Sequence, residues 1–401
     1  MNQNYRLEKN TPALQQRLNI VRPTFPPAES LFERFREALL SGQVTNGGRW
    51  VHEFEARLTE YLGVPTLAFC NGQMALMTML RAAGIESGEV IVPSLTFAAT
   101  PHAVRWCGAK PVFADVCRDG SMTLDPLDVE AKITPRTVAV LAVDAYGIAC
   151  DDRTLADVGR RRGIKILYDS AASFGSRVDG QLVGGFGDAQ IFSFHATKAL
   201  ATMEGGCLCS HDAALLERAK AIRNFGQTNG GDCLEAGMNG KLTEICALIG
   251  IEQLKVFERA AQTRRRSVNR MREGLQKIPG LEIGRAPLNQ DPIWLYLPIV
   301  IDKLIYGLDR NEVAAALEQQ NLVVRKYYSP PCHMMSAYRL SKQASLPNTE
   351  HIAANVLALP VFNDMTDEEC DGIVTAFLAI GQSKVRGRSR ADPPECGDSV
   401  C

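Results

Sequence analysis

Short apolar runs alternate with amphipathic stretches along the first two thirds of the chain. The apolar runs predict strands at 66–70, 89–92, 111–115, 138–143, 164–168, 190–193 and 207–209. The stretches with helical spacing predict helices at 31–40, 51–62, 74–83, 98–107, 125–133 and 155–162. Because all-apolar strands separated by helices are typical of a parallel sheet covered on both faces, the pattern predicts an α/β fold.

The pattern changes after about residue 245. A long helical stretch covers 244–275, a strand is predicted at 293–301, and amphipathic helices are predicted at 312–319 and 367–379. We interpret this part as a smaller α+β unit. The predicted organisation is a flexible lead-in at 1–20, a large α/β domain at 21–245, a small C-terminal α+β domain at 246–382, and a disordered tail at 383–401 that is rich in charge, Pro and Gly.

Composition narrows the function classes. The 401 residues are 46% hydrophobic and 22% charged with a net charge of -1, which excludes a disordered chain and argues against nucleic acid as the main partner. No apolar run is long enough for a membrane span, and the polar N-terminus has no secretory signal. Twelve scattered cysteines without a Cys-x-x-Cys motif favour free thiols in the cytoplasm, and the six histidines have no zinc-type spacing, so we predict no metal.

Three predicted strands end in polar residues, and ligands of α/β folds bind beyond the carboxyl ends of the strands. After the first strand, an Asn71-Gly72 turn leads directly into a helix, whose first N–H groups stabilise an anion. Asp169 follows the fifth strand, Ser193 ends the sixth, and Lys198 comes five positions later. Taken one by one, these features are also typical of a tight turn, a helix N-cap and a surface lysine.

Taken together, the same residues match the needs of one cofactor, pyridoxal 5'-phosphate (PLP). A lysine amine forms a Schiff base with an aldehyde, and a carboxylate keeps a pyridine nitrogen protonated. A serine hydroxyl and helix-end amides bind a phosphate. Asp169 precedes Lys198 by 29 residues, so we expect both at the ends of nearby strands.

On these and further motifs, the chain resembles the DegT/StrS-type sugar aminotransferases, which are PLP-dependent enzymes of fold type I. The resemblance extends from about Val21 to Phe377. It implies a mainly parallel central sheet with helices on both faces, in a large domain that binds the cofactor, and a smaller C-terminal α+β domain. The matching motifs lie at 45–47, 53–55, 71–76, 89–97, 108–113, 169–172, 193–198, 204–206, 223–226 and 237–241.

The resemblance also implies a role for each matching residue. Lys198 matches the lysine that binds the cofactor and moves protons, and Asp169 matches the partner of the pyridine nitrogen. The other cofactor contacts that it implies are Gly72, Gln73 and Met74 in the phosphate turn, Ser193 on the phosphate, Phe97 stacked on the ring, and Asn239 of the neighbouring subunit. Tyr328 and His333 match a loop near the sugar site.

Three positions depart from the family pattern. Gln73 stands where the family often has Thr or Ser, so an amide replaces a hydroxyl. Ser173 and Phe174 stand near a position where the family often has Gln or His. Lys241 replaces a commoner Arg, which keeps the charge and loses the bidentate fork. None of these changes removes the core chemistry.

We therefore predict a transaminase that moves an amino group from glutamate to a keto carbon of a nucleoside-diphosphate sugar. The segments 69–72 and 237–241 are most similar to enzymes that make 4-amino-4,6-dideoxy sugars from 4-keto-6-deoxy sugars. A 3-keto substrate stays open, as do the nucleotide, the stereochemistry and the pathway, either antibiotic glycosylation or surface polysaccharide. A dehydrase of the same fold would have His in place of Lys198, so Lys198 favours the transaminase. A non-catalytic relative would not need Lys198, Asp169 and Ser193, so the presence of all three argues against that alternative.

The segment 223–241 is rich in Gly, Asn and charge, and is too polar for a core. It is either a surface loop or, as the resemblance implies, part of a homodimer interface. In a twofold dimer the same loop would reach both active sites, with Asn239 and Lys241 near the cofactor phosphate of the neighbouring chain. We predict a homodimer with shared active sites.

Overall fold

A computed structural model of the chain describes residues 12–228, 230–339 and 345–388. Its central sheet has seven strands in the order β1-β9-β8-β5-β4-β2-β3. Neighbours pair in parallel except at β9, which is antiparallel to both β1 and β8. The α/β class and all seven predicted strands are thus confirmed. The strands are β1 (Thr66–Phe69), β2 (Glu89–Pro93), β3 (Lys110–Ala114), β4 (Thr137–Val143), β5 (Lys165–Asp169), β8 (Ala189–Ser193) and β9 (Gly206–Cys209).

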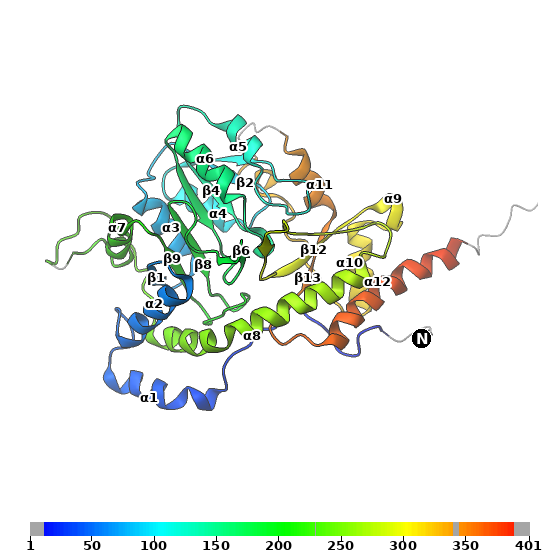
Figure 1. Cartoon of the computed structure of the whole chain (residues 1–401), viewed down its shortest axis with the longest axis horizontal. Coiled ribbons are helices and arrows are strands. Elements are labelled where there is room, and N and C mark those ends of the chain that lie inside the picture. The colour runs from blue at the N-terminus through cyan, green and yellow to red at the C-terminus, as the bar shows by residue number, and fades with distance from the viewer. Residues whose placement is uncertain (1–11, 229, 340–344, 389–401) are drawn as a thin grey trace, which may run out of the picture.

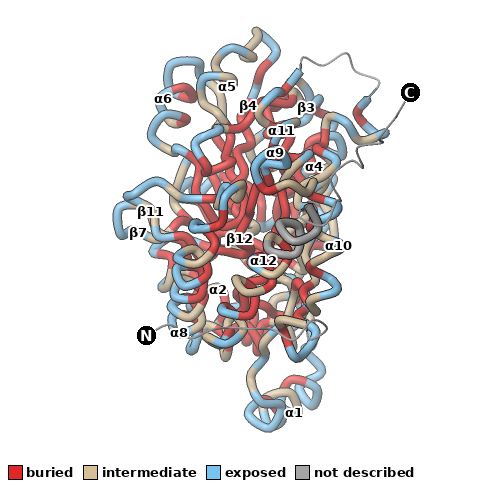
Figure 2. The backbone as a smooth tube through the Cα atoms, turned by 90° about the vertical axis from the view of Figure 1, so that its right-hand side faces the viewer, coloured by how far each residue is buried: buried red, intermediate tan, exposed pale blue. Residues whose placement is uncertain are grey.

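Helices cover both faces of this sheet, because alternate strand residues point to opposite sides. Val90 and Val92 of β2 pack in one core with α3, α4 and α7, whereas Ile91 packs in another with α5 and α6. Figure 2 shows the buried strands inside an exposed outer shell. The helices around the sheet are α2 (Arg49–Leu62), α3 (Gly72–Ala82), α4 (Ala99–Trp106), α5 (Pro126–Lys132), α6 (Asp152–Arg162) and α7 (Ala213–Arg223).

A single long helix, α8 (Glu244–Leu275), connects the large sheet to the C-terminal part (Figure 1). It packs against α1 (Phe32–Ser41) and α2 near its start and against α12 further on. Its first residue, Glu244, is 1% exposed and accepts the N–H groups of Gly48 at 2.8 Å and Trp50 at 2.8 Å. These N–H groups begin α2, where a negative charge is favourable, so this carboxylate ties the two helices together.

The C-terminal part contains an antiparallel three-stranded sheet, in the order β10-β12-β13, that packs with α8, α10 and α12 in its own core. A second small sheet joins β11 to β6 and β7. The remaining elements are η1 (Ala28–Ser30), β6 (Arg177–Val178), β7 (Gln181–Leu182), β10 (Leu281–Ile283), β11 (Gln290–Asp291), β12 (Tyr296–Ile301), α9 (Lys303–Tyr306), α10 (Arg310–Gln319), α11 (Pro347–Asn355), β13 (Val356–Pro360) and α12 (Asp367–Arg388), with 3-10 turns η2 (Ala145–Gly147) and η3 (Cys332–Met334).

Both ends of the chain are more ordered than predicted, in the part of each that the structure describes. Within the lead-in predicted at 1–20, Leu14 and Leu18 are buried in the C-terminal core, and the backbone of Leu18 pairs with Leu322. This part is therefore packed rather than flexible, while 1–11 lies outside the described residues. At the other end, α12 continues to Arg388, so 383–388 is helical where a disordered tail was predicted. Residues 389–401 lie outside the described part.

The middle of the chain shows two more differences. The strand predicted at 293–301 begins only at Tyr296, because the carbonyls of the three preceding residues accept hydrogen bonds from the buried Arg264 on α8. The segment around Cys332 and Leu346, predicted as part of the small domain, packs in the core beneath α3 and α4 of the large sheet.

Two general features complete the description of the fold. Across the three described ranges, no helix combines the length and the apolar character needed to span a bilayer. The ten cysteines of these ranges are free thiols, and Cys207 and Cys209 face the same side of β9 with their Sγ atoms 4.0 Å apart.

Candidate active site

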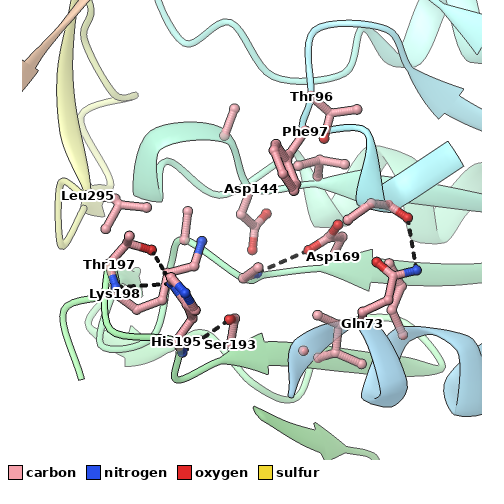
Figure 3. Close-up of a pocket in the computed structure, with 18 of the residues that line it drawn as sticks. Gln73, Thr96, Phe97, Asp144, Asp169, Ser193, His195, Thr197, Lys198 and Leu295 are labelled. Atoms are coloured by element: carbon pink, nitrogen blue, oxygen red, sulfur yellow. Dashed lines mark hydrogen bonds between the residues drawn. The ribbon is translucent and has the colours of Figure 1, made fainter. Parts of the chain in front are cut away.

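A cavity of about 450 Å³ lies at the carboxyl ends of β4, β5 and β8 (Figure 3). This volume is within the range of roughly 300–1,000 Å³ that is usual for small-molecule sites. Three separate stretches of the sequence thus meet at one edge of the sheet, as the strand-end argument requires. The predicted site residues that line the cavity are Gly72, Gln73, Phe97, Asp169, Ser193, Lys198 and Tyr328.

Three predicted site residues do not line this cavity. The side chain of Met74 packs against the core of the large sheet, and its N–H donates to Asn71 Oδ1 at 2.8 Å. Asn239 is exposed in a loop whose backbone pairs with Asn224. The ring of His333 is held by residues outside the lining: its Nδ1 lies 2.6 Å from Ser94 Oγ and its Nε2 lies 3.5 Å from Glu350 Oε1.

Lys198 lies in the loop after β8, where its N–H donates to the carbonyl of His195 at 2.8 Å. Burial lowers the pKa of its amine, and the nearby charge of Asp169 opposes this effect. A lowered pKa increases the fraction of neutral amine, which is the form that attacks an aldehyde and accepts a proton. A lysine with a lowered pKa is what both predicted roles of Lys198 require.

Asp169 is the last residue of β5 and is 6% exposed. Its Oδ2 accepts a hydrogen bond from Thr100 Oγ1 at 2.7 Å, and its Oδ1 accepts one from the N–H of Ala171 at 3.2 Å. Burial raises the pKa of this carboxyl group, whereas Thr100, Ala171 and the charge of Lys198 lower it. The carboxylate is thus oriented and lacks an ion-pair partner of its own among the described residues, so a ring cation bound in the cavity would favour its ionised form.

The start of α3 supplies the features of an anion site. Asn71 caps the helix through the N–H of Met74, while the N–H groups of Gly72 and Gln73 have no acceptor among the described residues. A Cβ on Gly72 would lie 2.9 Å from Cβ of Ser193, so glycine is required for this close approach. The turn therefore places the Ser193 hydroxyl beside two free helix N–H groups, which together suit a phosphate.

Asp144 is a cavity residue that the sequence analysis missed. It follows β4 directly, is 1% exposed, and accepts hydrogen bonds from Ser170 Oγ at 2.6 Å and Ser173 Oγ at 2.9 Å. Its own N–H donates to the carbonyl of Asp169 at 3.1 Å. Asp144 therefore supports the strand end that carries Asp169. The strand-end rule that found Asp169 would also have found Asp144.

We expect Asp144 to make stability depend on pH. Burial raises the pKa of Asp144 to about 6, from an ordinary value of 3.8. Asp144 therefore ionises at a lower pH in the unfolded chain than in the folded one. As pH rises from about 4 to about 6, its contribution to the free energy of unfolding falls by about 3 kcal/mol. Urea unfolding of the cofactor-free protein at fixed concentration should show that the stability difference between wild type and Asp144→Asn changes by this amount across the window. The exposed Asp157→Asn is the control, and a difference that stays constant with pH would contradict the assignment.

Three tyrosines of the described ranges line the cavity, and the sequence patterns did not predict two of them. Tyr296 begins β12 and Tyr327 precedes the predicted Tyr328. Tyr146 Oη donates to the carbonyl of Tyr327 at 2.5 Å and thereby fixes the backbone next to Tyr328. Burial raises the pKa of the Tyr328 phenol, so its hydroxyl stays protonated and can donate to an oxygen of a ligand.

The residues of this cavity fit PLP. The buried Asp169 suits a protonated pyridine nitrogen, Lys198 suits the aldehyde, and Ser193 with the start of α3 suits the phosphate. Phe97 is 64% exposed and lies across the cavity from Ser193, where an aromatic face is open to a flat ring (Figure 3). When bound there, PLP supplies an electron sink and a carrier for an amino group.

Known proteins resemble the chain over most of its length. The model of the DegT/DnrJ/EryC1/StrS aminotransferase family matches residues 27–378. A dTDP-4-amino-4,6-dideoxy-D-glucose transaminase of Shigella dysenteriae is 31% identical over 369 residues, which are 92% of this chain and 100% of the relative. A UDP-N-acetyl-3-dehydro-alpha-D-glucosamine 3-aminotransferase of Acidithiobacillus ferrooxidans is 34% identical over 80% of this chain and 86% of its own length.

Solved structures agree with these relatives. The crystal structure of DesI in the presence of its TDP-sugar product superimposes with a TM-score of 0.88 and 37% identity, covering 94% of this chain and 97% of that one. The predicted fold type, enzyme class and cofactor are thereby confirmed. The chain belongs to the DegT/DnrJ/EryC1/StrS family of PLP-dependent sugar aminotransferases.

Proposed function

We propose that the protein transfers an amino group from glutamate to the C4 carbonyl of a dTDP-4-keto-6-deoxy sugar, giving a dTDP-4-amino-4,6-dideoxy sugar. The observation that carries this proposal is the assembled cavity, in which Ser193 and Lys198 from the end of β8 meet Asp169 from the end of β5 and the start of α3. The similarity to a dTDP-4-amino-4,6-dideoxy-D-glucose transaminase and to the DesI structure with its TDP-sugar product supports the sugar and the nucleotide.

Each cavity residue has a defined task in this proposal. The Lys198 amine would hold the cofactor and, when free, would accept and donate a proton at Nζ. Asp169 keeps the ring nitrogen protonated, while Thr100 holds that carboxylate in place. Ser193 and the start of α3 would hold the phosphate of the cofactor. The Tyr328 hydroxyl contacts the sugar.

The second candidate acts at C3 of the sugar. The 34% identity to a 3-aminotransferase supports this candidate, since it is as high as the 31% identity to the dTDP-4-amino-4,6-dideoxy-D-glucose transaminase. Supplying the enzyme with glutamate and either dTDP-4-keto-6-deoxyglucose or a 3-keto isomer tests the proposal. We expect amine product from the 4-keto sugar at a kcat/KM at least about 100-fold higher, since the wrong carbonyl would lie away from Lys198. A preference for the 3-keto sugar would replace the proposal by the second candidate.

We propose further that the enzyme works as a homodimer. Helix α1 exposes Phe32, Leu39 and Leu40, of which Leu40 is 77% exposed. Asn239 is exposed and away from the cavity of its own chain. Both features would be explained if a second copy covered α1 and placed its Asn239 near the phosphate turn.

Mixing two inactive variants tests this shared site. Lys198→Ala and Asn239→Asp homodimers should each have little activity, because each lacks a residue that every site needs. After subunit exchange, one of the two sites in a mixed dimer would contain both intact residues. We expect the mixture to recover about a quarter of wild-type activity if exchange is complete. A fully active monomer in sedimentation, or no recovery in a mixture whose exchange is verified by mass spectrometry, would contradict the proposal.

A further inference from the structure

A second cavity of about 390 Å³ adjoins the active-site cavity and shares Thr96, Phe97, Tyr327 and Tyr328 with it. The rest of its lining comes from Ala98, Met335 and segment 324–330, in which Arg325, Lys326 and Pro330 are exposed. We call it the outer pocket, because the shared residues separate it from Lys198 and its other side reaches the surface. A substrate that entered the inner cavity past Tyr327 and Tyr328 would leave its far end in the outer pocket.

The charge of the outer pocket differs from that of the inner cavity. The inner lining carries Asp144, Asp169 and Glu204 against the single cation Lys198. The described lining of the outer pocket contains Arg325 and Lys326 and no acidic residue. Within the described ranges, neither of these two side chains takes part in an ion pair or a hydrogen bond. The outer pocket is therefore a second place in this site, besides the start of α3, that attracts an anion.

Two observations show that Arg325 is placed for this task. Its backbone pairs with Ala358 of β13, through an N–H to carbonyl distance of 3.3 Å in one direction and 2.7 Å in the other. Burial raises the pKa of the Tyr296 phenol, and the charges of Arg264 and Arg325 oppose that rise. Arg325 thus lines the outer pocket on a backbone that the small sheet holds in position, and its charge acts on Tyr296 of the inner lining.

We infer that Arg325 and Lys326 bind the diphosphate of the sugar-nucleotide substrate in the outer pocket. This inference rests on the proposed function, in which the sugar occupies the inner cavity. The diphosphate is attached to the sugar ring and so emerges next to it, at the side where two unpaired cations stand. Arg is suited to paired phosphate oxygens and Lys adds a point charge. The carboxylates of glutamate fit less well, because this short donor must bring its amine close to Lys198.

Titration calorimetry of the holoenzyme with dTDP tests the inference without any turnover. We expect Arg325→Gln and Lys326→Gln each to weaken dTDP binding about 10-fold, and the double variant about 100-fold. Binding by the wild type should weaken as salt rises, and the double variant should show less of this dependence. Lys277→Gln, at an exposed position that lines neither cavity, is the matched control and should bind dTDP like the wild type.

The outcomes separate this inference from the proposed function. Wild-type affinity in the double variant would overturn the inference. If the double variant kept its dTDP affinity but reacted more slowly with glutamate, the cations would serve the donor carboxylate, which also overturns it. Loss of dTDP binding in the double variant, in an enzyme that aminates no 4-keto sugar, would support the diphosphate site and reject the proposed function instead.

Discussion

Replacing Lys198 by Ala should lower transaminase activity by at least about 1,000-fold, because the chain then lacks both its covalent contact to the cofactor and its proton carrier. Lys198 is the only lysine among the described residues that line the inner cavity. The measurement is the steady-state rate with saturating PLP, together with the position of the cofactor absorbance band. Borohydride reduction followed by peptide mapping should place the cofactor on Lys198 in the wild type.

Two further variants define what this lysine does. Lys198→Arg keeps a positive charge near Asp169 but cannot become a neutral nucleophile, so we expect it to be as inactive as Lys198→Ala. Lys277→Ala removes an exposed lysine outside the cavity and should leave the rate unchanged. An active Lys198→Arg enzyme, or a reduced cofactor that mapped to another lysine, would show that the amine has been assigned wrongly.

Asp169→Asn should lower turnover by about 100- to 1,000-fold while PLP still binds, since the amide accepts the Thr100 hydrogen bond but cannot stabilise a ring cation. Thr100→Val is the matched variant, because it removes the hydroxyl that donates to Asp169 and also contacts Thr96 Oγ1 at 2.9 Å, but it keeps the charge of the carboxylate. We expect that loss to cost about 10-fold in turnover. The comparison requires kcat and the dissociation constant of PLP for both variants. Near-normal turnover of Asp169→Asn would refute an ionic role for this residue.

Local sequence patterns predicted the framework of the site well. Short apolar runs located every strand of the central sheet, and polar residues at strand ends located Asp169, Ser193 and Lys198, which meet in one cavity. Such predictions succeed because a strand buried on both faces must be apolar throughout, and because parallel strands bring their carboxyl ends to one edge. Asp144 directly follows β4, so the same rule would also have predicted it as a site residue.

Local sequence patterns could not predict the contacts between segments that are distant in the sequence. Leu14 and Leu18 are buried only because the C-terminal core offers them a surface, and nothing in the local sequence at 12–20 signals this. The predicted sugar contact His333 is held by Ser94, which lies 239 residues earlier in the sequence, and by Glu350 on α11. Asn239 is exposed in the single chain, so its predicted role depends on a second copy, which remains a proposal.

Transfer of labelled nitrogen tests the central claim most directly. The purified enzyme, loaded with PLP, would receive one equivalent of ¹⁵N-glutamate and, after removal of free amino acid, dTDP-4-keto-6-deoxyglucose. We predict that NMR of the product shows ¹⁵N bonded to C4 of the sugar, in an amount close to the number of active sites. Label at C3, or no labelled sugar while the cofactor has accepted the nitrogen, would contradict the proposed 4-aminotransferase.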